Sequence, residues 1–529
     1  MDVIRNPVLR GFEPDPSILR VGDDYYLATS TFEWYPGVRL HHSRDLVRWR
    51  VLGGVLTGAP QLDLRGVPDS GGVWAPCLSY ADGLFHVLYT VVDSYAEGWK
   101  DIPNYLVTSP RIDGPWSAPV FLHGRGWDVS LFHDADGRSW LLNMVFDWRP
   151  GRAGFAGIEI QEYSRSSRRL VGRPRLIFAG TSAGVTEGPH LYRRGGWYYL
   201  VVAEGGTGVE HQVTVARSRD LFGPYEPDPT GPLMTAKHDR GLTLQKAGHA
   251  CFVETQAGEW YMAHLTARPY QPSGRCVLGR ETAIQRIVWD GDGWPRLEGN
   301  GDGVARTRVP AVEVRRPGLT ADSAVGGDAG GHDFEGDWST LRRGMASDWI
   351  VVDSAVGEAV IAGGQSPVGR RGPSLLAHRV TDERCSLSAR VTFPATSVDH
   401  LAGIAGYYNT RNWHYQYVTA LDDGSLVVRA LSCVAGKLVA REEQLAVEPG
   451  DVVDMVAEFS GAVLRFSPLD VELDATILSD EHADEFHDGV VRTFGFTGAM
   501  VGLWVIDLAG EAPQPWARFS AVDYRVIDR

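Results

Sequence analysis

Five segments in the N-terminal half of the chain share one pattern of apolar and polar positions. Each has a polar or small residue, an apolar pair, a short turn, and then a run of aromatic and aliphatic residues. The turns contain strings such as ADG, DADG and RRGG, which are typical of β-hairpins. The segments begin at Asp15, Ala75, Asp128, Glu187 and His249, in steps of 60, 53, 59 and 62 residues. This regular spacing predicts a repeat architecture.

A second repeat follows three of these hairpins. The strings SRDLVRW, SPRIDGPW and SRDLFGPY begin at Ser43, Ser109 and Ser218, where an outer pair of strands would complete a four-stranded unit. Because four-stranded units repeated around an axis form a β-propeller, we predict a five-bladed propeller over residues 1–318. Five unrelated hairpins in a β-sandwich are the alternative, which the regular spacing and the double repeat disfavour.

The repeat pattern ends after Pro317. Residues 319–335 are rich in Gly, Ala, Ser and Asp and poor in apolar residues, which predicts a linker. Beyond it, strand-length runs such as CSLSARVTFPA and GAMVGLWVIDLAG follow one another without a 3.6-residue period. We therefore predict a β-sandwich over residues 336–529 and an all-β chain.

Composition narrows the class of protein. The chain has 529 residues, 43% hydrophobic and 22% charged, as in ordinary folded proteins. Its 62 glycines, 30 prolines, 17 tryptophans and 19 tyrosines suit short strands, tight turns and a sugar-binding surface. The net charge of −15 disfavours nucleic acid or an anionic membrane as a partner. No run approaches about 18 apolar residues, so the sequence predicts no membrane span.

The cysteines and the N-terminus bear on the compartment. The number of cysteines is odd and no Cys-x-x-Cys pair occurs, which disfavours a disulfide framework or a zinc site and favours a reducing compartment. The string MDVIRNPVLRGFEPDPS lacks the basic start and apolar core of a signal peptide. We therefore expect a cytoplasmic protein. The five cysteines are Cys77, Cys251, Cys276, Cys385 and Cys433.

Ionisable side chains begin four of the five repeats. The first strand of each propeller blade lines the central axis, so equivalent positions meet at one end of the channel. Asp15, Asp128, Glu187 and His249 should therefore converge on one pocket, with Trp74 beside the fifth position, Ala75. Three clustered carboxylates repel one another and lose solvation, which is typical of a functional site rather than a structural one.

Two kinds of chemistry use such a cluster. Glycoside hydrolysis needs a proton donor for the leaving oxygen and a carboxylate for the opposite face of the sugar. The donor's pKa must be raised by burial or by a neighbouring charge. Ca²⁺ also takes oxygen ligands, but the chain has no DxDxDG spacing, so a metal ranks second. We expect no required cofactor and no dedicated metal site, and we leave open a divalent cation such as calcium near His249.

Long strings of the sequence resemble glycoside hydrolase family 43, most closely its two-domain β-xylosidase/α-L-arabinofuranosidase subgroup. They include GFEPDPSILRVGDDYYLATSTFEWYPGV, GGVWAPCLSY, WDVSLFHDADGRSWLLNM, TEGPHLYRRGGWYYLVV and LGRETAIQ. The likeness runs from about residue 5 to 300 and continues more weakly through DWSTLRR and GFTGAMVGLWV. It implies a five-bladed propeller, an inverting mechanism, and a C-terminal concanavalin-like jelly roll that helps to close the pocket.

The resemblance also implies a role for each matched residue. Asp15 matches the general base that activates water, and Glu187 matches the general acid. Asp128 matches the acid that orients the donor and raises its pKa. Arg280, in GRETAIQ, matches a basic residue that contacts sugar hydroxyls and the carboxylates. The base and acid of an inverting pair are expected about 6.5–9.5 Å apart.

Further residues are candidates for substrate binding. Phe32 and Trp74 are predicted to be pocket walls that stack on sugar C–H faces; the alternative is that each is a core aromatic between blades. Thr207, in EGGTG, is expected to offer a polar contact near the second sugar. His249 points at the axis by its repeat position, with a structural histidine as an equal alternative.

Three features depart from the family pattern. Phe146 lies where relatives often carry Trp, and Met500, in TGAM, lies where relatives often place Phe from the second domain. The string GHACFVE differs from the glycine-rich form common after this histidine, which puts metal binding there in doubt. These changes bear on the balance between xylosyl and arabinofuranosyl substrates.

The sequence therefore predicts an inverting exo-glycosidase that releases xylose from the non-reducing ends of short β-1,4-xylo-oligosaccharides, with α-L-arabinofuranosidase side activity. A mainly α-L-arabinofuranosidase enzyme and a non-catalytic carbohydrate-binding protein are the alternatives. Endo-arabinanase activity is weaker still, because it needs an open cleft. The expected partner is the oligosaccharide, not nucleic acid or a membrane, and a homodimer or homotetramer is left open.

Overall fold

The computed structural model shows an almost wholly β-structured chain. Its only described helical segments are η1 (Ala475–Ile477) and α1 (Asp480–Ala483). No helix in the described part of the chain is long and apolar enough to cross a membrane. The structure describes residues 3–96, 98–298, 305–318, 334, 336–487, 490–510 and 513–527.

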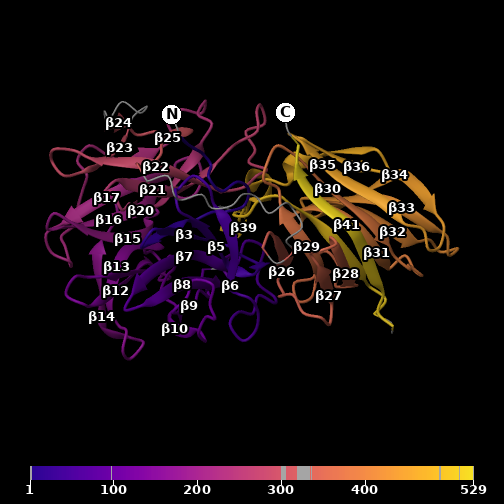
Figure 1. Ribbon diagram of the computed structural model, residues 1–529, viewed down its shortest axis with the longest axis horizontal. Helices are drawn as coiled ribbons and strands as arrows, with labels where there is room; N and C mark the ends of the chain where they lie inside the picture. Colours follow the sequence, from indigo (N-terminus) through magenta and orange to yellow (C-terminus); the bar gives the residue numbers. More distant parts are fainter. Residues whose placement is uncertain are drawn as a thin grey trace.

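The N-terminal part consists of five antiparallel sheets, shown in indigo to magenta in Figure 1. The first is β2 (Ser17–Val21), β3 (Asp24–Thr29), β5 (Gly37–Ser43) and β6 (Arg50–Leu56); the second is β7 (Gly72–Ala81), β8 (Leu84–Val92), β9 (Asn104–Ser109) and β10 (Val120–His123). The third is β11 (Ser130–His133), β12 (Ser139–Phe146), β13 (Phe155–Ser164) and β14 (Arg169–Phe178).

The last two sheets carry an extra strand each. The fourth is β15 (Glu187–Arg194), β16 (Trp197–Glu204), β17 (Gln212–Ser218), β18 (Glu226–Pro227) and β19 (Met234–Thr235). The fifth is β20 (Gln245–Glu254), β21 (Trp260–Ala267), β22 (Glu281–Trp289), β23 (Pro295–Glu298) and β24 (Ala305–Thr307). The first strands contact one another in a closed cycle, β2 to β7, β11, β15, β20 and back to β2. This ring is the five-bladed propeller that the repeats predict.

Local chemistry explains both repeats. Asp82 and Gly83 have φ of 51° and 77°, as a type I′ hairpin turn requires. In the second repeat, the Ser43 hydroxyl accepts a hydrogen bond from Asp45 N at 3.1 Å. The equivalent bonds, from Arg111 N to Ser109 Oγ and from Asp220 N to Ser218 Oγ, measure 3.2 and 3.1 Å. Each repeated serine therefore stabilises the turn between the third and fourth strands of its blade.

The N-terminal strand of the propeller pairs with the strand that follows its last blade, and this pairing closes the ring. Strand β1 (Val3–Arg5) pairs with β25 (Glu313–Arg315), which follows the last blade. Asn6 then bonds to β22 in both directions: its amide nitrogen donates to Ile284 O at 2.7 Å and its oxygen accepts from Ile284 N at 2.8 Å. These contacts tie the start of the chain to the fifth blade.

The C-terminal part is a sandwich of two large sheets, orange to yellow in Figure 1. One sheet has the order β34-β33-β32-β31-β40-β29-β26-β4, and the other β27-β28-β41-β30-β35-β36-β37. The first sheet contains β34 (Lys437–Val447), β33 (Leu426–Val434), β32 (Asn412–Ala420), β31 (His400–Asn409), β40 (Met500–Asp507), β29 (Ser374–Arg379), β26 (Trp338–Leu341) and β4 (Trp34–Tyr35). The second contains β27 (Ile350–Asp353), β28 (Glu358–Ala362), β41 (Trp516–Val526), β30 (Arg384–Thr392), β35 (Val453–Ser460), β36 (Val463–Ser467) and β37 (Val471–Asp474).

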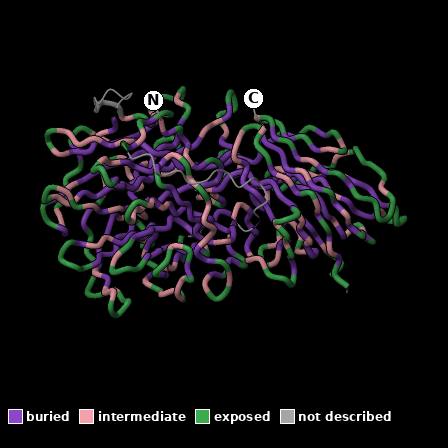
Figure 2. Tube along the Cα trace, viewed as in Figure 1, coloured by how far each residue is buried: buried purple, intermediate pink, exposed green. Residues whose placement is uncertain are grey.

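The two parts share a strand and buried ion pairs. Strand β4 leaves the first blade and pairs with β26 at the edge of the sandwich sheet. Nearby, Arg342 is fully buried and lies 2.7 Å from Asp69 Oδ1, while its Nε donates to Val67 O at 3.0 Å. The core continues across this contact, as the buried trace in Figure 2 shows. The sandwich is therefore packed on the propeller as a fixed second wall.

The predicted fold class is confirmed: an all-β chain with a five-bladed propeller and a concanavalin-like sandwich. The small hairpin β38 (Glu485–His487) and β39 (Val490–Thr493) projects from the sandwich. The predicted linker 319–335 lies, apart from Phe334, outside the described residues. The domain limits at residues 318 and 336 stay predictions. All five cysteines are free and buried.

Candidate active site

The start of each blade's first strand has an unusual backbone conformation. The φ angles are 54° at Asp15, 33° at Ala75, 56° at Asp128, 58° at Gly188 and 45° at His249. Positive φ in a non-glycine residue costs about 1–3 kcal/mol and concentrates at functional sites. At or next to these positions, Asp15, Ala75, Asp128, Glu187 and His249 line one cavity at the end of the channel.

One predicted equivalence is wrong by one residue. Gly188, not Glu187, occupies the position of Asp15 in the fourth blade, because Gly188 carries the positive φ. Glu187 stands one place earlier, at the position of Trp74 and Trp127. It still lines the pocket, as Trp74 and Trp127 do at the same position of the second and third blades.

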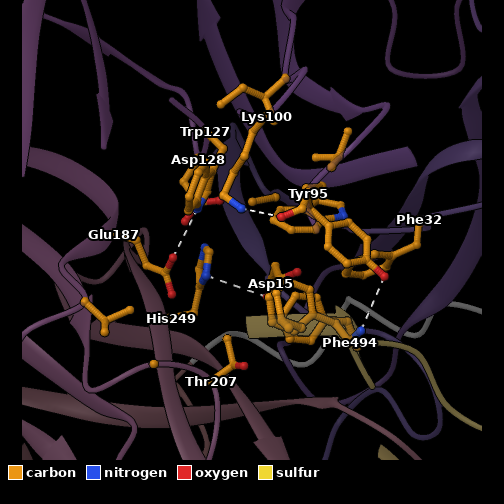
Figure 3. Close-up of a pocket in the computed structure, with 18 of the residues that line it drawn as sticks. Asp15, Phe32, Tyr95, Lys100, Trp127, Asp128, Glu187, Thr207, His249 and Phe494 are labelled. Carbon is orange, nitrogen blue, oxygen red and sulfur yellow. Dashed lines mark hydrogen bonds and ion pairs between the residues drawn. The ribbon is translucent and has the colours of Figure 1, made fainter. Parts of the chain in front are cut away.

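These strands open into a cavity of about 520 Å³ that both domains line. Asp15, Asp128 and Glu187 all lie on its wall, as Figure 3 shows. The propeller supplies most of the wall, and the sandwich adds five residues. Those five are Asp484, Phe486, Val491, Phe494 and Phe496. The second domain therefore covers part of the pocket directly.

Asp15 is surrounded by groups that favour its charged form. Ser30 Oγ donates to Asp15 Oδ2 at 2.7 Å, and Arg280 Nη1 and His249 Nδ1 lie 3.5 and 3.6 Å from Asp15 Oδ1. Burial alone would raise the pKa of Asp15, but Arg280, His249 and the Ser30 hydroxyl outweigh it and lower that pKa below its ordinary value. Asp15 is therefore a carboxylate at neutral pH.

Asp128 and Glu187 form a coupled pair with the opposite tendency. Burial and the charge of Glu187 raise the pKa of Asp128 well above its ordinary value. Burial raises the pKa of Glu187 to about 7; the Trp127 indole, whose Nε1 donates to Glu187 Oε2 at 3.1 Å, opposes that rise, and the charge of Asp15 adds to it. Gly188 N donates to Asp128 Oδ2 at 2.9 Å. The pair therefore holds a proton at neutral pH.

Arg280 joins the carboxylates to the second domain. Its Nε and Nη2 both donate to the Phe496 carbonyl oxygen, at 3.0 and 2.9 Å, and its guanidinium lies 4.6 Å from the Phe496 ring centroid. Ser70 holds the same segment from the other side: Ser70 Oγ donates to Phe494 O at 2.7 Å and accepts from Phe496 N at 3.2 Å. Residues 494–496 are thus fixed as a wall of the pocket.

The predicted aromatic walls line the cavity. Phe32, Trp74 and Phe146 are among its lining residues. Phe32 and Trp74 also belong to the core between the blades, so each is both a core aromatic and a pocket wall. Thr207 lines the cavity as well, next to Gly206 and Gly208.

Met500 is not brought to the pocket. It is fully buried in β40, paired with Tyr407 and Arg379 in the sandwich sheet, and absent from the cavity lining. Phe494 and Phe496, in the segment just before β40, provide the aromatic wall instead. The expectation that Met500 binds substrate therefore has no structural support.

His249 lines the cavity and faces Asp15. Burial lowers the pKa of His249, and Arg280 adds to this while Asp15 opposes it, so the ring is neutral at pH 7. Among the described residues, no three His, Cys, Asp or Glu side chains gather in an arrangement that could hold a metal ion. The divalent cation left open near His249 stays a prediction, and none of the proposed catalytic steps passes through a metal.

Several pocket residues had no signal that the sequence analysis used. Lys100 lies on the β8–β9 connection, lines the cavity, and donates to the Tyr95 carbonyl; its Nζ is 5.1 Å from the Phe146 ring centroid. Trp127 could have been found, because it precedes Asp128 as Trp74 precedes Ala75. Phe494 and Phe496 come from the other domain, where no repeat marks them.

Two family models divide the chain as the fold does. Residues 4–295 match the glycosyl hydrolases family 43, and residues 331–525 match the beta-xylosidase C-terminal concanavalin A-like domain. The chain belongs to glycosyl hydrolase family 43. The resemblance to its two-domain β-xylosidase subgroup is thereby confirmed, and the protein is a glycoside hydrolase.

Individual relatives agree over nearly the full length. A beta-xylosidase of Bacillus subtilis is 40% identical over 96% of this chain and 97% of that protein. A xylosidase/arabinosidase of Humicola insolens is 40% identical over 100% of this chain and 98% of that protein. The crystal structure of a xylan beta-1,4-xylosidase from Bacillus halodurans superimposes with a TM-score of 0.90 and 41% identity, covering 99% of this chain and 100% of that one.

Proposed function

We propose that this family 43 enzyme is an inverting exo-β-xylosidase that releases xylose from the non-reducing ends of short β-1,4-xylo-oligosaccharides, with α-L-arabinofuranosidase side activity. The names of the Bacillus subtilis and Bacillus halodurans relatives, a beta-xylosidase and a xylan beta-1,4-xylosidase, support the substrate class. The name of the Humicola insolens relative supports the side activity.

The observation that carries the proposal is the contrast between the carboxyl groups of one pocket. Asp15 is held ionised by Arg280 and the Ser30 hydroxyl, whereas the buried pair Asp128 and Glu187 retains a proton. Carboxyl groups pushed in opposite directions within one pocket are typical of an acid and a base acting together. A purely carbohydrate-binding site has no need of this arrangement.

In the reaction that we infer, Asp15 takes a proton from a water molecule as that water attacks the anomeric carbon of the terminal sugar. Glu187 donates its proton to the leaving glycosidic oxygen, and Asp128 keeps that proton available through the coupled pair. Attack by water on the face opposite the leaving group inverts the anomeric configuration, so a β-xyloside releases α-xylose. Arg280 and the aromatic walls orient the sugar.

The shape of the pocket supports exo cleavage. Its volume of about 520 Å³ is within the ordinary range for a small-molecule site, about 300–1,000 Å³. The segment 494–496 stands against Trp74 and Arg280, with ring centroids of Phe496 and Trp74 5.5 Å apart. A wall at this place leaves room for a chain end rather than for a polymer passing through.

A mainly α-L-arabinofuranosidase activity is the second candidate, because the two sugars present similar hydroxyl geometry to one pocket. Initial rates on p-nitrophenyl β-D-xylopyranoside, p-nitrophenyl α-L-arabinofuranoside and xylobiose separate the two candidates. Fast release from the xyloside and from xylobiose supports the proposal, and a clear preference for the arabinofuranoside overturns it in favour of the second candidate.

The acid's role has its own test in the variant Glu187→Gln. Loss of the general acid should lower kcat/KM on xylobiose by about 10²–10⁴-fold. The loss should be much smaller on dinitrophenyl β-D-xylopyranoside, whose leaving group needs no proton. Asp15→Asn is the matched variant, because removing the base should slow both substrates alike. Equal losses for Glu187→Gln on both substrates would contradict the assignment.

The remaining expectations are also proposals. We infer a cytoplasmic location, supported by five free, buried cysteines; cell fractionation tests it. A homodimer or homotetramer stays open, and light scattering coupled to size-exclusion chromatography decides it.

A further inference from the structure

Two tryptophans are stacked on the outside of the molecule. Of the 17 tryptophans in the chain, Trp99 and Trp148 are the two exposed ones, with 63% and 49% of their surface accessible. Their ring centroids are 3.9 Å apart and their planes are inclined by 23°. Large exposed apolar rings are unfavourable in water and, when grouped, usually mark a binding surface.

The pair lies beside the mouth of the catalytic pocket. Trp99 precedes Lys100 on the β8–β9 connection, and Trp148 follows Phe146 by two residues at the end of β12. Both Lys100 and Phe146 line the cavity, and Lys100 Nζ lies 5.1 Å from the Phe146 ring centroid. The two segments therefore meet twice, first at the cavity wall and then, farther out, at the stacked indoles.

A series of ring contacts leads from the reacting groups to Phe146, two residues before Trp148. Trp74 and Trp127 are 6.1 Å apart, and Trp127 and Phe146 are 5.8 Å apart, measured between ring centroids. Trp74 and Trp127 are 9% and 5% exposed, whereas Trp99 is 63% exposed. Trp127 also bonds to Glu187. Aromatic rings thus extend from the proton donor to Phe146, and the exposed Trp148 follows two residues later.

The chemistry of the occupant follows from this position. A pyranose ring presents C–H faces that pack on indole rings, and tryptophan is rigid, so little entropy is lost on binding. Stacking on each other holds both indoles in place before any ligand arrives. The non-reducing sugar sits among the carboxyl groups, so the part of the substrate that extends outwards is the reducing-end part of the oligosaccharide.

We propose that Trp99 and Trp148 form a distal leaving-group subsite, which binds a xylosyl unit beyond the sugar attached to the scissile bond. The proposal rests on the proposed function and deepens it: the enzyme should favour xylotriose or xylotetraose over xylobiose. Xylobiose ends at the sugar attached to the scissile bond and does not reach Trp99 and Trp148. The two rings should therefore not raise kcat/KM on xylobiose.

The test is the dependence of kcat/KM on chain length in Trp99→Ala and Trp148→Ala. We expect kcat/KM on xylotetraose to fall about fivefold, the equivalent of about 1 kcal/mol for one ring contact, mainly through KM. The rate on xylobiose should stay unchanged. Trp99→Phe should retain most of the preference for the longer chain. Phe121→Ala is the control, because Phe121 is 60% exposed on β10 and takes no part in the pair.

Several outcomes would overturn the proposal. Equal losses on xylobiose and xylotetraose would mean that the variants disturb the pocket, and unchanged chain-length dependence would mean that the pair binds no sugar. Conversion of an oligomer to monomers in the variants would assign the pair to contact with a second copy of the chain. The failure of the proposed function itself looks different: wild-type protein would then not hydrolyse xylobiose at all.

Discussion

The indole N–H of Trp127 should set the alkaline limit of activity. It donates at 3.1 Å to Glu187, favours the charged form of that acid, and thereby opposes the rise of its pKa to about 7. Trp127→Phe keeps an aromatic ring in the wall and removes only this donor. A hydrogen bond to a charged group stabilises that charged form by about 1.5 kcal/mol. One pKa unit corresponds to about 1.36 kcal/mol, so losing this bond should raise the pKa of Glu187 by about one unit.

The assay is the pH profile of kcat/KM on xylobiose at constant ionic strength. Activity needs Asp15 ionised and Glu187 protonated, so the alkaline limb follows the pKa of Glu187. In Trp127→Phe this limb should move up by about one pH unit. Trp140→Phe is the matched control, since the buried Trp140 indole nitrogen has no hydrogen-bond partner. A limb that stays in place or moves down in Trp127→Phe would refute the reasoning.

Three further predictions concern stability, the pocket wall and metal dependence. Arg342→Ala leaves Asp69 buried without its cation and should lower the free energy of unfolding by about 3–5 kcal/mol, measured by urea denaturation with activity as a second probe; no change would contradict the interface described. Phe496→Ala should change the ratio of xyloside to arabinofuranoside rates, whereas Met500→Leu should leave that ratio unchanged because Met500 does not reach the cavity; the reverse pattern would restore the sequence-based expectation for Met500. Chelator should leave the rate on xylobiose unchanged, and a loss that added calcium restores would establish a required metal.

The repeats predict the propeller well because each one carries its own local chemistry. A hairpin turn such as Asp82-Gly83 needs positive φ, and the serine of the second repeat bonds the turn that follows it, so the pattern recurs wherever the unit does. Strand β4 had no such signal. Its two residues, Trp34 and Tyr35, belong to the first blade by sequence, and only tertiary packing places them in the sandwich sheet.

The site was predictable as far as the repeat reaches. Asp15, Asp128 and His249 were predicted from equivalent positions on the inner strands. Glu187 was assigned to the same position, which Gly188 occupies instead. The sequence did not show this, because the position is defined by a positive φ angle, which Gly188 carries. Met500 was misplaced for a different reason.

An apolar residue in a strand does not reveal what it packs against, and Met500 is buried in the apolar cluster between the sandwich sheet and the propeller without lining the cavity. The wall comes from residues 494–496, which Ser70 and Arg280 hold through backbone groups that no side-chain pattern records.

The central claim is best tested by following xylobiose hydrolysis with time-resolved ¹H NMR. The anomeric signals report turnover and stereochemistry together, before mutarotation mixes the anomers. We expect α-xylose to appear first from the non-reducing sugar, and Glu187→Gln to abolish its appearance on the same timescale. Initial formation of β-xylose would contradict inversion, and no hydrolysis of xylobiose by the wild-type protein would contradict the proposed substrate.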